Sequence, residues 1–215
     1  MVCRGLLCAV FVMAVGLPLS ASPFTNGSFE TNTGGVCNPG PGYAELGVGS
    51  TCISSWSIVS GNIDYVGGLW QPENGNYSID LDGNIDGAIA QTFDTIVGNV
   101  YSVTFFLAGN TNAAPTTKDL TVSATGATTQ GYTFNDTGFT NTNMGYIQET
   151  YSFTAGSTST TLTFTSTDSP SSAAGAVIDN VSVANLTASP EPGSLALVFI
   201  GAGAIIAGYR RKRRS

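Results

Sequence analysis

Four aspartates are the first residues of this sequence to consider for catalysis. They lie close together in the chain, as Asp64, Asp80, Asp82 and Asp86, and glycosidases need two carboxyl groups about 5–10 Å apart across a cleft. A structural role is also open, because Ile79-Asp-Leu-Asp-Gly83 is how a strand runs into a turn whose Asp side chains accept backbone N–H bonds. The chain has no His, which excludes Ser-His-Asp and Cys-His pairs and imidazole metal sites. No nucleophile elbow or phosphate loop is present, so we expect no enzymatic activity, with a glycan hydrolase as the alternative.

Two further acids suggest a metal site. Glu30 ends the segment Asn26-Gly-Ser-Phe-Glu30, and Asp179 lies in Val177-Ile-Asp-Asn-Val-Ser-Val183. The first and last strands of a sandwich can lie side by side, and two facing carboxylates repel each other unless a hard cation joins them. This pairing resembles the structural Ca²⁺ site of galactose-binding-like jelly rolls, which implies Glu30, Asp179 and Asn26 as ligands, with backbone carbonyls. The alternative is that each acid caps a turn separately.

Aromatic and amide side chains in the middle of the chain suggest a sugar site. Exposed Trp and Tyr rings offer flat apolar faces that match the C–H face of a pyranose, and neighbouring amides can bind hydroxyls. The predicted ligand-binding residues are Trp70, Gln71, Tyr65 and Tyr77. A Trp in a sandwich is often part of the core, so a core position stays open for Trp70, and Trp56 is assigned to the core.

The balance of charges limits the partners of the domain. The 215-residue chain carries 7 Lys and Arg against 14 Asp and Glu, and six of those cations lie near its two ends. In the middle, Lys118 stands alone against thirteen acids. A surface this acidic repels phosphate backbones, so we expect no nucleic-acid partner.

Short strands are expected to hold the candidate site residues in place. Apolar and polar residues alternate with period two through Tyr101–Leu107, and shorter alternating runs surround Leu120, Tyr151, Leu162 and Val181. Gly, Asn and Asp clusters separate the runs, and no 3.6-residue period of useful length is found. Strands at this spacing, closed by such turns, predict an all-β sandwich or barrel, and residues 23–187 suit one domain.

Both ends of the chain are predicted to be sorting signals. Residues 1–22 have a positive start at Arg4, an apolar run broken at Pro18 and small residues for cleavage, which indicates a secretory signal helix; a buried first helix is the alternative. Export to an oxidising compartment then favours a disulfide between Cys37 and Cys52 over free thiols. It would close a surface loop and stabilise the domain by roughly 3 kcal/mol in the chain-entropy model.

The C-terminal residues 188–215 combine three features. Leu195–Tyr209 is an apolar run of 15 residues that, extended to about 193–209, predicts a short transmembrane helix. A basic tail follows the run, and a Pro-Glu-Pro motif precedes it: Arg210, Arg211, Lys212, Arg213 and Arg214; Pro190, Glu191 and Pro192. Together they resemble the PEP-CTERM sorting signal of Gram-negative and related bacteria. The resemblance implies an inner-membrane intermediate, recognition and cleavage by an exosortase, and an association with exopolysaccharide. An ordinary single-span anchor is the alternative.

An ordered series of motifs runs through the domain between the two end motifs. It comprises Gly61-Asn-Ile-Asp-Tyr-Val66, Trp70-Gln71, Gly75–Gly83, Gly87–Phe93, Gly98–Tyr101 and Leu107–Asn110. The series resembles the choice-of-anchor C family over about residues 24–185, a bacterial relative of plant cell-wall proteins in the galactose-binding-like superfamily. The resemblance implies a jelly-roll sandwich with an extracellular, glycan-associated role. We therefore expect an exported, non-catalytic cell-surface or matrix protein that binds extracellular polysaccharide; the alternative is a structural or adhesive protein without a specific ligand.

Overall fold

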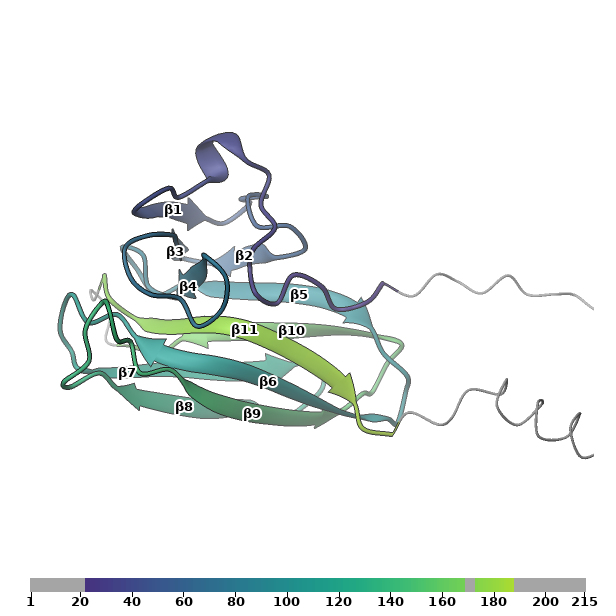
Figure 1. Ribbon diagram of the computed structural model, residues 1–215. Coiled ribbons are helices and arrows are strands. Elements are labelled where there is room, and N and C mark those ends of the chain that lie inside the picture. Colours follow the sequence, from purple (N-terminus) through teal and green to yellow (C-terminus); the bar gives the residue numbers. More distant parts are fainter. Residues whose placement is uncertain (1–21, 169–172, 188–215) are drawn as a thin grey trace, which may run out of the picture.

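The computed structural model describes residues 22–168 and 173–187, which form two packed antiparallel sheets (Figure 1). One sheet has six strands in the order β1-β3-β4-β11-β6-β9, and the other has five in the order β2-β5-β10-β7-β8. The elements are η1 (Gly35–Cys37), β1 (Tyr43–Gly47), β2 (Ser57–Ser60), β3 (Asn62–Val66), β4 (Ser78–Asp80), β5 (Ala88–Asp94), β6 (Val100–Gly109), β7 (Thr117–Ala124), β8 (Gln130–Asn135), β9 (Ile147–Thr154), β10 (Ser159–Ser166) and β11 (Ala176–Asn185). The expected all-β sandwich is confirmed.

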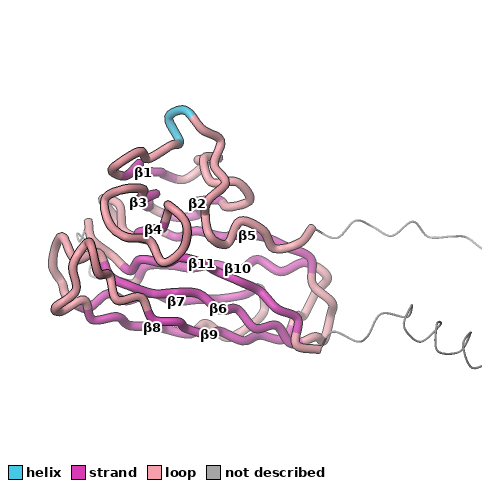
Figure 2. The backbone as a smooth tube through the Cα atoms, in the orientation of Figure 1, coloured by secondary structure: helices cyan, strands magenta, loops and turns pink. Residues whose placement is uncertain are grey.

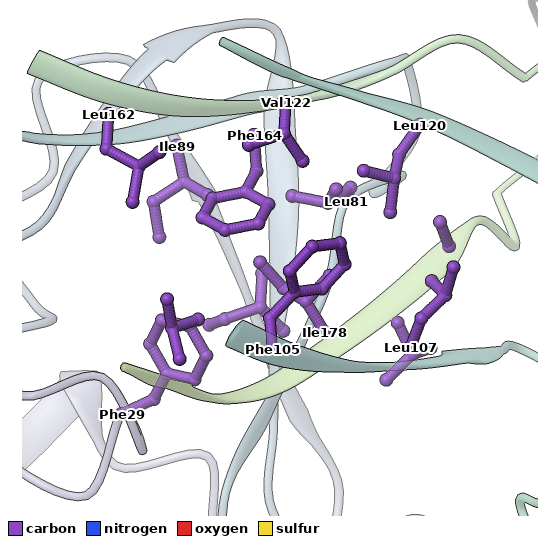
Figure 3. Close-up of a cluster of buried hydrophobic side chains, with 14 of the residues drawn as sticks. Phe29, Leu81, Ile89, Phe105, Leu107, Leu120, Val122, Leu162, Phe164 and Ile178 are labelled. Atoms are coloured by element: carbon purple, nitrogen blue, oxygen red, sulfur yellow. The ribbon is translucent and has the colours of Figure 1, made fainter. Parts of the chain in front are cut away.

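Alternation along the strands builds the core between the sheets. In β6 the side chains of Tyr101, Val103, Phe105 and Leu107 are buried, as their period-two spacing predicts. Figure 3 shows Phe105, Leu107 and Ile178 on one side of this core and Leu120, Val122, Leu162 and Phe164 on the other. The Phe105 and Phe164 rings meet edge to face at 5.1 Å, which adds about 0.5–1.5 kcal/mol beyond the area they bury.

Three loop segments contact one another and carry the residues discussed below: the segment before β1, the β3–β4 connection and the β8–β9 connection (Figure 2). The β3–β4 connection contacts the disulfide-bearing segment before β1, because Gly67 N donates to Gly42 O at 2.8 Å. It also contacts the β8–β9 connection, because Gln71 N donates to Asn141 O at 2.8 Å. Backbone hydrogen bonds thus fix three loops that are distant in sequence against one another.

The predictions for the chain ends lie outside the described residues. The signal helix falls on residues 1–21, and the Pro-Glu-Pro motif, apolar run and basic tail fall on 188–215. Within residues 22–168 and 173–187, no helix is long and apolar enough to cross a membrane. The two ends of the described chain lie at the same end of the sandwich (Figure 1), where Asp94 N donates to Ser22 O and Leu186 N donates to Val100 O.

Candidate functional site

A shallow hollow of about 370 Å³ lies where the β3–β4 connection meets the segment before β1. Its lining combines glycine backbone, a proline, two amides and two aromatic residues: Asn38, Gly40, Gly67, Gly68, Trp70, Pro72, Gly75, Asn76 and Tyr77. Small-molecule sites of about 300–1,000 Å³ are common in proteins. The hollow therefore has room for a ligand the size of a sugar unit. Its amides are held by hydrogen bonds, since Asn76 Nδ2 donates to Glu30 Oε2 and Asn38 Oδ1 accepts from Gly40 N.

A second hollow of about 350 Å³ adjoins the first, because Pro72 lines both. The other residues around it come from the β3–β4 and β8–β9 connections: Gln71, Glu73, Asn143, Met144, Gly145 and Tyr146. Gln71 and Asn143 are exposed, so their amides are accessible. The two hollows are neighbours that share Pro72, and together they are called the loop groove below.

The three predicted aromatic residues lie at different depths. Tyr77 is half-buried, and its ring packs on Tyr65 with centroids 5.0 Å apart. Tyr65 itself is 0% exposed and donates its hydroxyl to Phe29 O at 2.7 Å. The prediction that Tyr65 touches a ligand is therefore wrong, because its ring only supports Tyr77 from below.

Trp70 is a core residue at the base of the groove. Its side chain is 4% exposed, and Nε1 donates to Ser78 Oγ at 2.9 Å. Of the two positions open for Trp70, the structure selects the buried one, and Trp56 is buried as expected at 3% exposure. Tyr77 is thus the predicted aromatic side chain that keeps accessible surface in the groove.

Two carboxylates hold the loop that carries Tyr77. Glu30 Oε1 accepts hydrogen bonds from Asn76 N at 2.7 Å and Tyr77 N at 2.9 Å. Asp179 Oδ2 accepts from Glu73 N and Asn74 N, each at 2.9 Å. Each carboxylate therefore clamps one end of Glu73–Tyr77, and this positions the groove.

The turn between these clamps requires glycine. Gly75 has φ of +66°, and a Cβ at this position would collide with the Glu30 carboxyl group. A side chain here would disfavour the left-handed backbone conformation and would push the Glu30 carboxylate away from the loop. The glycine thus allows the carboxylate to approach the backbone of the loop.

The predicted calcium ligands do not fit a calcium ion in this arrangement. The expected adjacency exists, since Val181 N donates to Gly27 O at 2.8 Å. However, the lone pairs of Glu30 and Asp179 are directed at backbone N–H groups, and Asp179 Oδ1 also accepts from Asn180 N at 2.6 Å. Asn26 Oδ1 accepts from Thr31 N at 2.9 Å. Ca²⁺ needs oxygen lone pairs that are free of donors, so the alternative of separate caps describes these three residues better.

The predicted disulfide is confirmed. Cys37 and Cys52 are bonded, with Cα atoms 5.1 Å apart and a sequence separation of 15. The bridge follows η1 and ties down the segment that supplies Asn38 and Gly40 to the groove. Closing a loop of this length stabilises the fold by roughly 3 kcal/mol.

The aspartates considered for catalysis are largely inside the protein. Together with Asp168 they form a group called the aspartate cluster below: Asp64, Asp80, Asp82, Asp86 and Asp168. Asp80 and Asp82 are both 0% exposed. Burial raises the pKa of Asp80 to about 7, and burial with like charges nearby raises that of Asp82 to about 7. Neither residue lines the loop groove, so neither reaches a ligand held there.

Several groove residues were not identified from the sequence. Asn38, Asn76 and Asn143 lie in loop segments outside the strands, where an Asn is common and does not by itself indicate a binding site. Their convergence depends on contacts between the three connections, for which a single sequence carries no signal.

The fold resembles several solved carbohydrate-binding modules at low similarity. TmCBM61 in complex with β-1,4-galactotriose has 16% identity and a TM-score of 0.43, covering 77% of this chain and 99% of that one. A family 35 module from Clostridium thermocellum has 12% identity and a TM-score of 0.42, covering 61% and 88%. The CBM22-1 xylan-binding domain from Paenibacillus barcinonensis has 13% identity and a TM-score of 0.42, covering 67% and 91%.

Sequence comparisons give closer matches. Halomucin from Haloquadratum walsbyi is 33% identical over 165 residues, which cover 74% of this chain but only 2% of halomucin. Residues 22–184 match the model of the family described as "Protein of unknown function (DUF642)". This match spans the whole described sandwich up to β11, and the chain therefore belongs to the DUF642 family.

Proposed function

We propose that this protein is an exported, non-catalytic module that binds polysaccharide in the loop groove. The observation that carries the proposal is the half-buried Tyr77 ring, held beside the amides of Asn38 and Asn76 over glycine backbone. A flat ring packs against the C–H face of a sugar, while amide and peptide groups bind its hydroxyls. The second hollow extends this surface, which suits a chain of sugars better than a single one.

The charge of the domain favours a neutral glycan. Among the described residues Lys118 is the one cation, and it is 0% exposed, with Nζ donating to Ala113 O at 3.0 Å and to Ala174 O at 2.6 Å. No exposed cation in the described ranges is therefore available to pair with a uronate or sulfate. Glu73, at the groove, would repel such groups.

Burial of the acids supports a binding role rather than hydrolysis. A glycosidase needs two carboxyl groups that reach the scissile bond from opposite sides. Asp80 and Asp82 have no exposed surface. Glu30 is engaged by backbone N–H groups.

We further propose the cellular route that the sequence motifs indicate. In this proposal the protein is a choice-of-anchor C relative with a galactose-binding-like jelly roll, exported through a cleaved signal. Its C-terminal segment holds it in the inner membrane until an exosortase processes it at the cell surface, where the mature protein meets exopolysaccharide. The described chain begins at residue 22 and ends at residue 187 on the same end of the sandwich (Figure 1).

A glycan array with matched tyrosine variants tests the binding proposal. Tyr77→Ala should lose at least tenfold in affinity for the glycan retained by wild type, as expected when a central aromatic contact is removed. Tyr43→Ala is the control, because Tyr43 is 55% exposed and does not line the groove. Equal binding by both variants, or retention of no polysaccharide by wild type, contradicts the proposal and leaves the structural or adhesive role.

A further inference from the structure

Unpartnered carboxylate oxygens gather in the aspartate cluster, away from the loop groove. Asp82 is 0% exposed, and neither of its oxygens has a hydrogen-bond partner of normal distance and angle among the described residues, although the nearby Ser166 side chain favours its ionised form. Asp86 Oδ1 and Asp168 Oδ2 are buried and unpartnered in the same way. An ionised carboxylate without a donor or a positive charge is costly to bury. These oxygens therefore need a positively charged partner, or a proton, to be stable in the fold.

Backbone contacts bring the three residues to one place. Asp82 and Asp86 form an isolated antiparallel bridge, and Gly87 N donates to Leu81 O at 2.8 Å to close the loop between them. Ser166, at the end of β10, donates its N–H to Gly87 O at 2.9 Å, which sets the segment leading to Asp168 beside this loop. The carboxyl groups of Asp86 and Asp168 each interact electrostatically with that of Asp82.

The neighbouring Asp80 differs because its oxygens are satisfied. Its Oδ1 accepts from Asp82 N and Gly175 N, both at 3.0 Å, and its Oδ2 accepts from Asn110 Nδ2 at 2.7 Å. A Cβ on Gly175 would lie 2.6 Å from the Asp82 carboxyl carbon, so the backbone covers the cluster closely. Unpartnered buried oxygens are thus found on Asp82, Asp86 and Asp168, and also on Asp64, whose Oδ1 lacks a partner.

Lys118 does not meet this need. It acts electrostatically on Asp168, but its ammonium donates to two backbone carbonyls and lies 3.9 Å from Asp136 Oδ2. Asp119, which follows it, adds another negative charge near Asp168. One engaged lysine against this group of acids leaves an excess of negative charge inside the sandwich.

We propose that Asp82, Asp86 and Asp168 bind a hard divalent cation, for which Ca²⁺ is the probe. Carboxylate oxygens without N–H donors are the ligands that such ions prefer. Within the described ranges no three Asp, Glu or Cys side chains already meet the arrangement of a metal site. Ion binding here therefore requires the three carboxylates to come closer together, which their like charges oppose until the cation is present. This assignment differs from the one made on Glu30 and Asp179, whose oxygens already have donors.

Thermal melting of the full-length protein tests the site. At about pH 8, well above the usual range of Asp, saturating CaCl₂ is compared with EDTA at equal ionic strength. An ion present at about 100 times its Kd should raise the Tm by about 5–10 °C for a domain of this size. Asp82→Asn should abolish the rise, and in EDTA it should melt at or above the wild-type Tm because it removes a buried charge. A merely structural Asp82 would instead make the variant melt lower in both buffers.

Two control variants locate the ion. Glu149→Gln removes an acid on β9 outside the cluster, and Asp179→Asn removes the acid first predicted to bind calcium. Both should keep the calcium-dependent rise in Tm. The proposal is overturned if calcium does not raise the Tm of the wild type, if the rise persists in Asp82→Asn, or if it is lost in Asp179→Asn. It is also overturned if only a lower pH, and not calcium, raises the Tm of the wild type, because protonation of the carboxyl groups then accounts for their stability.

Discussion

Replacement of Trp70 by alanine tests whether this residue stabilises the core or binds the ligand. The indole is 4% exposed and donates to Ser78 Oγ at 2.9 Å. Removal of a buried Trp side chain typically costs about 3–5 kcal/mol, since the transfer free energy is lost and a cavity is left. It also leaves Ser78, which is 1% exposed, without this donor. At about 2–4 °C per kcal/mol for a domain of this size, the Tm should fall by about 6–20 °C.

Urea unfolding followed by circular dichroism measures this cost, with polysaccharide retention assayed on the same samples. The lost stability should appear as a lower denaturation midpoint with an unchanged slope. Trp70→Phe is the matched variant, because it keeps an aromatic ring in the core and should lose less stability. A Trp70→Ala protein with wild-type stability but no glycan binding would refute the burial of this side chain and make the indole the sugar platform.

Three further perturbations test other parts of the structure. Joint replacement of Cys37 and Cys52 by serine should cost roughly 3 kcal/mol of unfolding free energy and weaken glycan binding, because the bridged segment lines the groove; unchanged urea midpoints would contradict this. Gly75→Ala should cost about 1–2 kcal/mol through its positive φ and also reduce glycan retention, whereas Gly131→Ala, at a glycine with open space around it, should do neither. In EDTA the Tm should fall as the pH rises from about 5 to about 8: burial raises the folded-state pKa values of Asp80 and Asp82 to about 7 from 3.8, so their protonated forms stabilise the fold below that range and the benefit is lost as they ionise. A Tm that rises over this interval would contradict the pKa shifts.

The strands could be predicted from the sequence because burial in a sandwich follows period two. Tyr101 to Leu107 alternate with polar residues, and β6 buries the alternating set as expected. The burial of each aromatic residue could not be predicted in the same way, since Tyr65 and Tyr77 both directly follow a polar residue, Asp64 and Asn76. Only the packing of β3 against the rest of the sandwich makes Tyr65 fully buried and leaves Tyr77 partly exposed.

The partners of the acids were the hardest feature to predict. Proximity of Glu30 and Asp179 was expected from the first and last segments of the domain, but the Glu73–Tyr77 loop that both carboxylates bind is distant in sequence. Asp82 follows a strand and precedes Gly83, where an exposed turn position is the usual outcome. Its burial arises from the closed Leu81–Gly87 loop and from Gly175 packed over it, which are tertiary contacts.

Chemical-shift mapping with the oligosaccharide identified on the array shows where on the protein the sugar binds. The isotope-labelled protein is titrated with that sugar while the backbone amide signals are followed. The largest changes should fall on the loop groove, at Gly67, Gly68, Asn76, Tyr77 and the Gln71 side-chain amide. Changes centred instead on the hollow beside β9, at Gly126, Ala127 and Thr154, would contradict binding in the loop groove, as would a titration that moves no signal.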